Sequence, residues 1–184
     1  MKLNYAKDVV RRSRLIMPVH VGKYIKKAYL RNADAIVLDL EDSVPSNLKE
    51  HARSLVKDAI LEVGKGGSDV FVRVNNEEEY LIEDVTASVW PGVEGIYLPK
   101  VETVENIKEV ESLIEKLEKE RGIEVGTLKI SVIIESCLGY LNMQTIAQAS
   151  DRIDSITIGN EDFFGDLGVV SNDDTYYALL TPKF

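Results

Sequence analysis

Short, nearly continuous apolar runs alternate along the chain with longer stretches in which apolar residues recur every three or four positions. The short runs predict strands that are covered on both faces, as in a parallel sheet. These strands are expected at Leu15–Val19, Ala35–Leu40, Val70–Val74, Gly95–Leu98, Ile130–Ile134 and Ser155–Ile158. The longer stretches predict helices at Lys23–Arg31, Leu48–Val63, Tyr80–Val89, Val104–Gly122 and Tyr140–Gln148.

Six β–α units in a row predict an α/β fold, either an open doubly wound sheet or a closed barrel. The turn after the first strand, Pro18 to Gly22, lacks the G-x-G-x-x-G pattern of a Rossmann fold. Acidic residues instead follow three different strands, and barrels build their active sites from several strand ends. The sequence therefore favours a TIM-type (β/α)8 barrel.

The chain is short for a complete barrel, which usually takes about 250 residues. We therefore expect residues 1–184 to form a single barrel domain with about six β–α units, lacking the last two. A further helix is expected to begin within residues 171–180. An open six-stranded sheet would expose apolar edges and tend to associate.

Charge and cysteine content limit the partners and the compartment. The chain has 22 basic and 31 acidic residues, a net charge of −9, which argues against nucleic acid or an anionic membrane as a partner. A single cysteine, Cys137, excludes an intramolecular disulfide and fits a reducing compartment. No signal-peptide pattern and no apolar run of about 20 residues is present. These features predict a soluble, cytoplasmic protein.

Two acidic residues mark the ends of two neighbouring predicted strands. Glu135 follows Ile130–Ile134, and Asp162 follows Ser155–Ile158 after a glycine turn. If these strands are parallel and adjacent, they lie about 4.8 Å apart, and both carboxylates leave the same edge. One or two carboxylates, with water and substrate in the other positions, suit Mg²⁺. Each carboxylate alone could equally cap the helix that follows it.

Five short motifs stand at the predicted strand ends. In chain order they read LDLEDSVP from Leu38, VRVN from Val72, LPKVE from Leu98, IIES from Ile133 and GNEDFFGDLG from Gly159. Together they resemble the citrate lyase β-subunit-like group of the HpcH/HpaI aldolase superfamily, whose patterns run LDLEDAV, VRVN, LPKVE, IET and G-x-x-D-L-x-x-D-L-G. The resemblance covers Arg14 to Gly168. It implies a (β/α)8 barrel that assembles as a homo-oligomer, a trimer or larger.

The resemblance also implies a reaction and a role for each site residue. Family members cleave or form a carbon–carbon bond next to an acyl-CoA thioester through an enolate, with a keto acid as the other product. Carried over by motif, Glu135 and Asp162 bind Mg²⁺, and Arg73 binds the oxygen on which negative charge develops. Glu41 and Asp42 hold metal-bound waters. A cation and a guanidinium are suited to this chemistry because both stabilise charge on oxygen.

Other residues near these motifs have simpler interpretations. A salt bridge is the expected role for Lys100, and capping of a helix after the loop is expected for Asp166. Cys137 has no basic neighbour in the sequence, so packing in the core is expected rather than nucleophilic chemistry. His20 departs from the family pattern in the first loop and could transfer a proton near neutral pH. Arg73, placed between two valines, could instead face solvent.

Three functions remain open from the sequence. The first is a Mg²⁺-dependent lyase acting on a β-hydroxyacyl-CoA such as citryl-CoA or malyl-CoA. The second is a CoA-independent aldolase for 4-hydroxy-2-keto acids, which keeps the metal pair but needs no phosphate-binding surface. The third is a barrel that binds a keto acid and a metal without turnover. The acyl group, the general acid or base and the oligomer size cannot be read from these residues.

Overall fold

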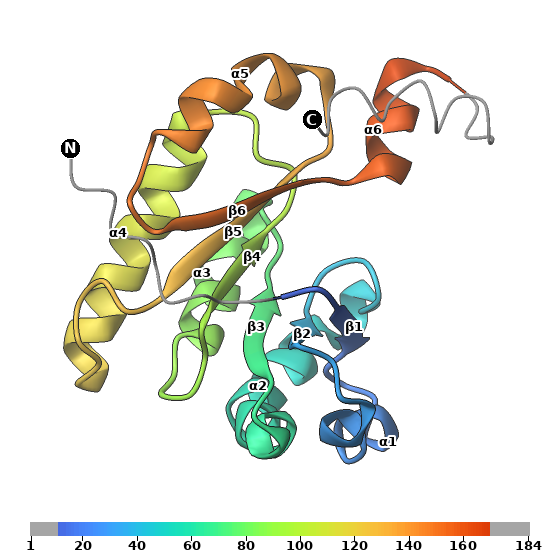
Figure 1. The fold of residues 1–184 in the computed structure, drawn as a ribbon, viewed down its shortest axis with the longest axis vertical. Coiled ribbons are helices and arrows are strands. Elements are labelled where there is room, and N and C mark those ends of the chain that lie inside the picture. The colour runs from blue at the N-terminus through green and yellow to red at the C-terminus, as the bar shows by residue number, and fades with distance from the viewer. Residues whose placement is uncertain (1–10, 170–184) are drawn as a thin grey trace.

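A computed structural model describes residues 11–169 as one curved parallel sheet with helices on its outer face (Figure 1). The six strands lie in sequential order, each paired in parallel with the next. They are β1 (Arg14–Pro18), β2 (Ala35–Asp39), β3 (Asp69–Arg73), β4 (Gly95–Leu98), β5 (Lys129–Ile134) and β6 (Ile153–Ile158). All six strands were predicted, and their order is the one that a (β/α) barrel requires.

The connecting helices follow the predicted pattern with two differences. The observed helices are α1 (Gly22–Ile25), η1 (Ala28–Arg31), η2 (Ser46–Leu48), α2 (Lys49–Val63), η3 (Gly64–Gly66), α3 (Glu78–Ser88), α4 (Val104–Arg121), α5 (Cys137–Ala147) and α6 (Asn160–Leu167). The helix α6 was not predicted, because its sequence was interpreted as a loop motif. The helix expected within residues 171–180 lies outside the described residues.

The first predicted helix is broken in the structure. Lys27, with φ −122°, interrupts it between α1 and the 3-10 turn η1. Lys23, Lys27 and Arg31 are spaced four residues apart, so a continuous helix would stack like charges on one face, which destabilises it. The prediction of a single helix at 23–31 was therefore wrong.

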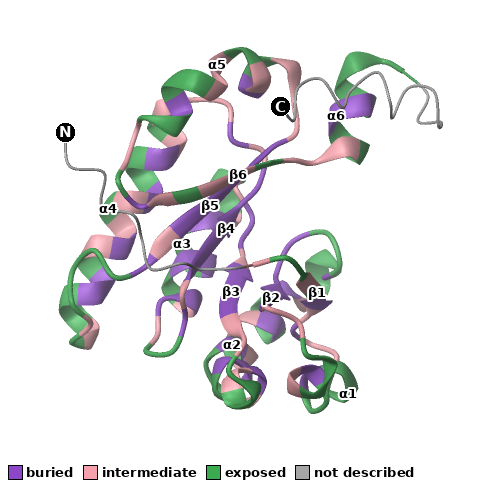
Figure 2. Cartoon of the chain, viewed as in Figure 1, coloured by how far each residue is buried: buried purple, intermediate pink, exposed green. Residues whose placement is uncertain are grey.

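Alternation along the strands gives the sheet two different apolar faces. Residues such as Ile36, Val72 and Ile130 point outward and pack with α2, α3 and α4 in the larger core. The inner, concave face carries a smaller cluster, made of Ala35, Val37, Phe71, Tyr97 and Ile133. Figure 2 shows the central strands buried, whereas β6 at the rim is partly exposed. The core thus fixes the central strands, and with them the strand ends.

Within residues 11–169, β1 and β6 do not pair with each other, so the sheet does not close into a barrel between these two strands. Arg14, in β1, nevertheless reaches across the concave side. Its guanidinium donates to Ser155 Oγ at 3.2 Å and to the hydroxyl of Tyr97. Arg11, just before β1, pairs with Asp154 of β6 at 2.6 Å. These arginines connect the two ends of the sheet and show how strongly it curves.

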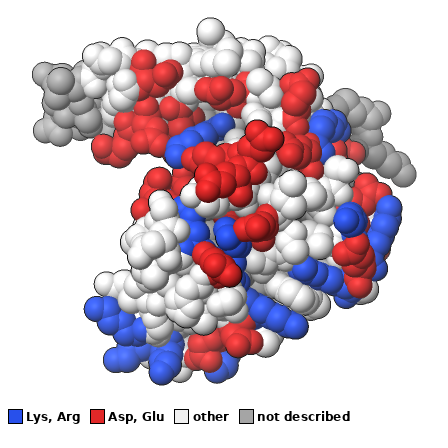
Figure 3. Space-filling view, turned by 180° about the vertical axis from the view of Figure 1, so that it is seen from behind, with Lys and Arg blue, Asp and Glu red and all other residues white. Residues whose placement is uncertain are grey.

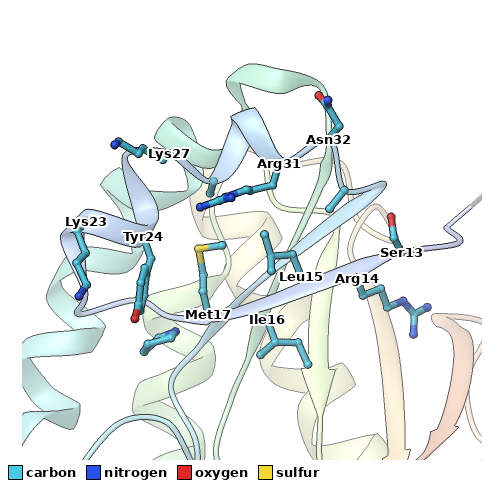
Figure 4. Close-up of a pocket in the computed structure, with 13 residues that line it drawn as sticks. Ser13, Arg14, Leu15, Ile16, Met17, Lys23, Tyr24, Lys27, Arg31 and Asn32 are labelled. Carbon is cyan, nitrogen blue, oxygen red and sulfur yellow. The ribbon is translucent and has the colours of Figure 1, made fainter.

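The free edge of β1 borders a groove of about 590 Å³. Figure 4 shows Leu15 and Met17 on the side of β1 that faces α1 and η1, where Lys23 and Arg31 also lie, and Ile16 on the opposite side of the strand. Ile16 is 47% exposed, although it belongs to a strand. Within the described part of the chain, no helix is long and apolar enough to cross a membrane.

Candidate active site

The carboxyl ends of β2 and β3 hold a buried ion pair. Asp39 and Arg73 are the last residues of these strands and lie opposite each other in the register. Arg73 donates from Nε to Asp39 Oδ1 at 2.7 Å and from Nη2 to Oδ2 at 2.8 Å. The side chain of Asp39 is fully buried and that of Arg73 is 13% exposed. Arg73 therefore faces the concave side of the sheet, and the alternative that it points to solvent was wrong.

Glu41 lies between two cations at the same edge. Its Oε2 is 2.9 Å from Arg73 Nη1, and its Oε1 is 2.9 Å from Lys100 Nζ. Burial raises the pKa of Glu41 to about 7, although both cations act to lower it. Burial also acts to lower the pKa of Lys100, but the negative charges of Glu41, Glu77 and Asp42 outweigh this and raise it. The salt-bridge role predicted for Lys100 is confirmed.

Lys100 connects this ion cluster to the next pair of strand ends. Its backbone has φ +52°, an uncommon conformation for a residue other than glycine. In this conformation its backbone N–H donates to Glu135 Oε2 at 3.0 Å, while its carbonyl accepts from Asn76 Nδ2 at 3.1 Å. Left-handed residues with side chains tend to occur where a site requires them. No pattern in the sequence predicts this backbone strain.

Glu135 and Asp162 line one cavity of about 340 Å³, together with Lys100, Glu102, Ser136 and Asp166. Burial raises the pKa of Glu135, and the negative charge of Asp162 raises it further. Asp162 is exposed and belongs to the first turn of α6. The structure thus brings together the two carboxylates that the sequence assigned to a metal. At this edge the surface is hollowed between the part carrying α5 and α6 and the part carrying α1 and α2 (Figure 3).

The donor set at this cavity fits a hard cation such as Mg²⁺. Two carboxylates repel each other across the cavity, and a Cβ atom at Gly159 would lie only 2.2 Å from Glu135 Oε1, so the backbone closes around this carboxylate. No group of three or more His, Cys, Asp or Glu side chains in residues 11–169 is arranged to hold a metal. A site with two protein ligands and the remainder from water or substrate is the usual arrangement for Mg²⁺.

A buried polar network beneath the site escaped the sequence analysis. Lys49 Nζ donates to the carbonyls of Leu40 and Glu41 at 2.9 and 3.1 Å and to Asn75 Oδ1 at 2.8 Å. Asn75 in turn donates to Asp84 at 2.6 Å and to the carbonyl of Leu40 at 2.9 Å. This network fixes the loop that carries Glu41. The asparagine of the VRVN motif was a signal for it, because an amide at a buried strand end needs partners.

Asp39 is the other site residue that was not predicted from the sequence. It alternates with Ala35 and Val37, which both belong to the inner apolar cluster. An acidic residue continuing that face must be paired if it is buried, and Arg73 is the cation opposite it in register. The alternation in the strand indicates that a buried Asp39 needs a cation, but only the register of the two strands identifies Arg73 as that cation.

Two residues near the cavity have roles other than those predicted. Asp166 lies within α6 and accepts the backbone N–H of Cys137 at 2.7 Å, so it caps the preceding helix α5 rather than a later one. Cys137 is half-buried instead of being packed in the core. Its hydrogen bond to the Asp166 carboxylate, together with desolvation, raises the pKa of the thiol. A raised pKa disfavours the thiolate, in agreement with the prediction that Cys137 is no nucleophile.

Glu102, from the LPKVE motif, and His20, from the first loop, lie at different places relative to the cavity. Glu102 Oε1 accepts from Ser136 Oγ at 2.7 Å, which orients the residue that caps α5. His20 lies in the loop after β1 and is half-buried. It does not line the cavity of Glu135 and Asp162, so proton transfer by His20 stays a prediction.

The chain is similar in sequence to known proteins. The citrate lyase subunit beta of Leuconostoc mesenteroides subsp. cremoris is 40% identical over 159 residues, which cover 86% of this chain and 53% of the relative. Human mitochondrial citramalyl-CoA lyase is 28% identical, with 96% of this chain and 55% of the relative covered. This chain thus spans about half the length of the curated relatives it matches.

Solved structures share the fold. A malate synthase lead(II) complex of Haloferax volcanii superposes with a TM-score of 0.78 at 19% identity, covering 91% of this chain and 55% of that one. The citrate lyase beta subunit of M. tuberculosis, complexed with oxaloacetate and magnesium, gives a TM-score of 0.68 at 22% identity, covering 94% and 73%. The family described as HpcH/HpaI aldolase/citrate lyase matches residues 12–179. The chain therefore belongs to the HpcH/HpaI aldolase/citrate lyase family.

Proposed function

We propose that this chain carries the metal and keto-acid site of a Mg²⁺-dependent carbon–carbon lyase, which cleaves or forms a β-hydroxyacyl-CoA such as citryl-CoA or malyl-CoA. The relatives named citrate lyase subunit beta and citramalyl-CoA lyase support this reaction class. The M. tuberculosis relative complexed with oxaloacetate and magnesium supports the choice of ligand and metal.

One observation carries the proposal. A buried, carboxylate-bound arginine and a pair of facing carboxylates stand at the same edge of the sheet, and Lys100 joins them through its backbone N–H and its side chain. Glu135 and Asp162 would hold the cation, and Glu41 and Asp42, which pair with Arg73 and Lys100 at the same strand ends, would order water around it. The cation would supply a Lewis acid for a substrate oxygen.

The chain's own residues would bind and orient the keto acid. Arg73 has a planar guanidinium that can hold a carboxylate in a bidentate manner. In the cleavage direction, its N–H groups would stabilise the negative charge that develops on the keto-acid oxygen. The strained backbone of Lys100 keeps Glu135 beside this point. The proton acceptor is not assigned to any residue described here.

Calorimetric titration of oxaloacetate tests the site using only residues present in the chain. We expect binding that requires Mg²⁺ and that Glu135→Gln abolishes. Glu161→Gln is the matched control, because Glu161 is an exposed acid in the first turn of α6 that does not line the cavity. Binding that is independent of Mg²⁺, or equally weakened by both variants, would contradict the proposal. A positive result would justify assays of citryl-CoA and malyl-CoA cleavage.

We further propose that the chain is a cytoplasmic protein that associates through the free edge of β1. The exposed backbone of an edge strand is a template for pairing, and Ile16 of this strand, opposite Val37 of the inner cluster, has an apolar side chain that is 47% exposed. Light scattering after size-exclusion chromatography should show a homo-oligomer of the wild type and a smaller species for Ile16→Asp. A monomeric wild type would exclude this interface.

A further inference from the structure

Asp39 has no surface through which it could touch a substrate. Its residue is 0% exposed, beneath Arg73 and the loop that carries Glu41. Its carboxylate accepts two hydrogen bonds from Arg73, one from the backbone N–H of Glu41 at 3.0 Å and others from Ser43. Whatever Asp39 does for a bound ligand must therefore pass through the residues it holds.

The way Asp39 holds Arg73 leaves one side of the guanidinium for a ligand. A guanidinium has five N–H donors in a planar fork. Asp39 takes the side formed by Nε and Nη2. Glu41 stands 2.9 Å from Nη1 and restrains the group from a second direction, and the exposed carboxylate of Asp42 lies farther from the same nitrogen, at 3.6 Å. The end formed by Nη1 and Nη2 keeps N–H donors in the parallel arrangement that matches a second carboxylate.

We propose that Asp39 is a positioning residue: with Glu41 it fixes the guanidinium of Arg73 so that the Nη1 and Nη2 end presents its remaining N–H donors to the keto-acid substrate. This inference rests on the proposed function for the identity of the ligand. An arginine held by a buried carboxylate does not have to be ordered again when the ligand binds, and such pre-organisation increases affinity. Asp39 also removes the desolvation penalty of placing Arg73 in the sheet interior.

The pair formed by Glu118 and Arg152 provides a matched control. Glu118 is also 0% exposed and also binds an arginine through both oxygens, at 3.0 and 2.7 Å. It lies in the last turns of α4, and Arg152 directly precedes β6, at the opposite edge of the sheet. Loss of this pair should weaken the fold without disturbing the keto-acid site.

The test compares Asp39→Asn with Glu118→Gln. Both variants should unfold at lower temperature than the wild type. In the presence of Mg²⁺, Asp39→Asn should bind oxaloacetate about tenfold more weakly, because a small misplacement of a binding group is costly. Glu118→Gln should bind within about twofold of the wild type, as expected for a distant site. Equal affinity in Asp39→Asn, or equal weakening in both variants, would overturn the inference.

A second readout needs no ligand, so that its failure can be separated from failure of the proposed function. In ¹⁵N NMR spectra, the Nε–H signal of Arg73 should be sharp and slow to exchange in the wild type and in Glu118→Gln. It should be lost or averaged in Asp39→Asn. If the wild type binds no oxaloacetate, the proposed function fails, and this signal alone decides whether Asp39 fixes Arg73. An unchanged signal in Asp39→Asn would overturn the inference.

Ser43→Ala keeps the test decisive if Asp39→Asn does not fold. Ser43 is exposed, and its hydroxyl and backbone N–H both donate to Asp39 Oδ2. Removing the hydroxyl should loosen Asp39 without a buried cavity, broaden the Arg73 Nε–H signal and weaken oxaloacetate binding about threefold, the effect of losing one hydrogen bond. A wild-type Arg73 signal in Ser43→Ala would then overturn the inference.

Discussion

The sheet carries two buried carboxylate–arginine pairs: Asp39 with Arg73 at the carboxyl-end edge of the strands, and Glu118 with Arg152 at the amino-end edge. The two pairs differ in what surrounds them. Glu118 accepts from Arg152 and also from the backbone N–H groups of Gly126 and Leu128, at 3.0 and 2.9 Å. Burial acts to raise its pKa, but these donors outweigh burial and lower it. Asp39 is satisfied in a similar way, yet Arg73 is also shared with Glu41, whose pKa is raised by burial.

The difference shows what turns a structural ion pair into part of a site. At the edge of Glu118 each carboxylate oxygen accepts one hydrogen bond from Arg152 and one from a backbone N–H, so the pair is closed. At the edge of Arg73 the carboxylates of Glu41, Glu135 and Asp162 accumulate beyond the available cations, and two have raised pKa values. A surplus of one charge at a concave strand edge is what a metal or a charged substrate can neutralise.

The largest effect should come from breaking the closed pair. Arg152→Met leaves the Glu118 charge buried without its cation, which typically costs about 3–5 kcal/mol of the free energy of unfolding. Urea denaturation at neutral pH measures this loss. Oxaloacetate binding by the folded fraction should stay within about twofold of the wild type. If the free energy of unfolding fell by less than about 1 kcal/mol, the Glu118–Arg152 pair would stabilise the fold no more than a surface ion pair does.

The free energy of unfolding should change with pH in opposite directions for Glu41 at one edge and Glu118 at the other. Glu41 has a pKa raised from 4.5 to about 7, so the folded state holds a proton that the unfolded state has lost. Its contribution to stability is complete below pH 4.5 and is lost as the pH rises through 7, by at most about 3 kcal/mol. Glu118 has a lowered pKa, so its contribution is present above pH 4.5 and is lost as the pH falls below it.

Urea denaturation from pH 3 to pH 8 of the wild type, Glu41→Gln and Glu118→Gln would measure these slopes. The stability of the wild type relative to Glu41→Gln should fall between pH 4.5 and pH 7. Its stability relative to Glu118→Gln should rise on leaving acid pH. If the stability of the two variants changed with pH in the same way, the two edges would not differ in their electrostatics.

Replacing Arg73, which contacts both Asp39 and Glu41, by lysine tests whether this edge takes part in the reaction. Arg73→Lys keeps the positive charge but cannot bind Asp39 through two parallel N–H bonds and still reach a ligand. If the lyase assignment holds, turnover should fall about 100-fold, close to 2.7 kcal/mol, as on removing one charge-stabilising donor. Steady-state kinetics with malyl-CoA or citryl-CoA would measure it. Turnover near that of the wild type would exclude Arg73 from charge stabilisation.

The sequence predicted the sheet because the central strands are nearly continuous apolar runs, and the core depends on those side chains. It predicted Glu135 and Asp162 because parallel strands bring their carboxyl ends to one edge, and the structure places both at one cavity. Arg73 and Lys100 were found from motifs at strand ends. These predictions needed only local patterns together with the parallel order of the strands.

What escaped the sequence depends on contacts between segments far apart in the chain. The pairing of Asp39 with Arg73 joins residues 34 positions apart, and Lys49 with Asn75 joins residues 26 apart. The helix α6 was missed because its sequence was interpreted as a loop motif, although Phe163 and Phe164 bury one face of it. The φ of +52° at Lys100 could not be foreseen, because lysine has no preference for it.

The smallest effects on stability and ligand affinity should come from replacing two glycines, Gly95 at the amino end of β4 and Gly159 just after the carboxyl end of β6. At Gly95, the start of β4, a Cβ atom would lie 2.3 Å from the carbonyl oxygen of Lys129, which is backbone and cannot move easily. At Gly159, a Cβ atom would meet Cγ, Cδ and Oε1 of Glu135, so this side chain would have to leave its present position. Gly95→Ala should therefore cost stability, whereas Gly159→Ala should cost ligand affinity.

We expect Gly95→Ala to lower the free energy of unfolding by about 1–3 kcal/mol and to leave metal-dependent oxaloacetate binding unchanged. Gly159→Ala should lower stability by less than about 1 kcal/mol and weaken that binding about tenfold, as on displacing a ligand or its support. Gly165→Ala is the neutral control, because no atom lies within 4 Å of its added Cβ. Calorimetry and urea denaturation measure both quantities. If Gly159→Ala loses stability but keeps its affinity, Glu135 is a structural carboxylate like Glu118, and the two edges differ only in charge.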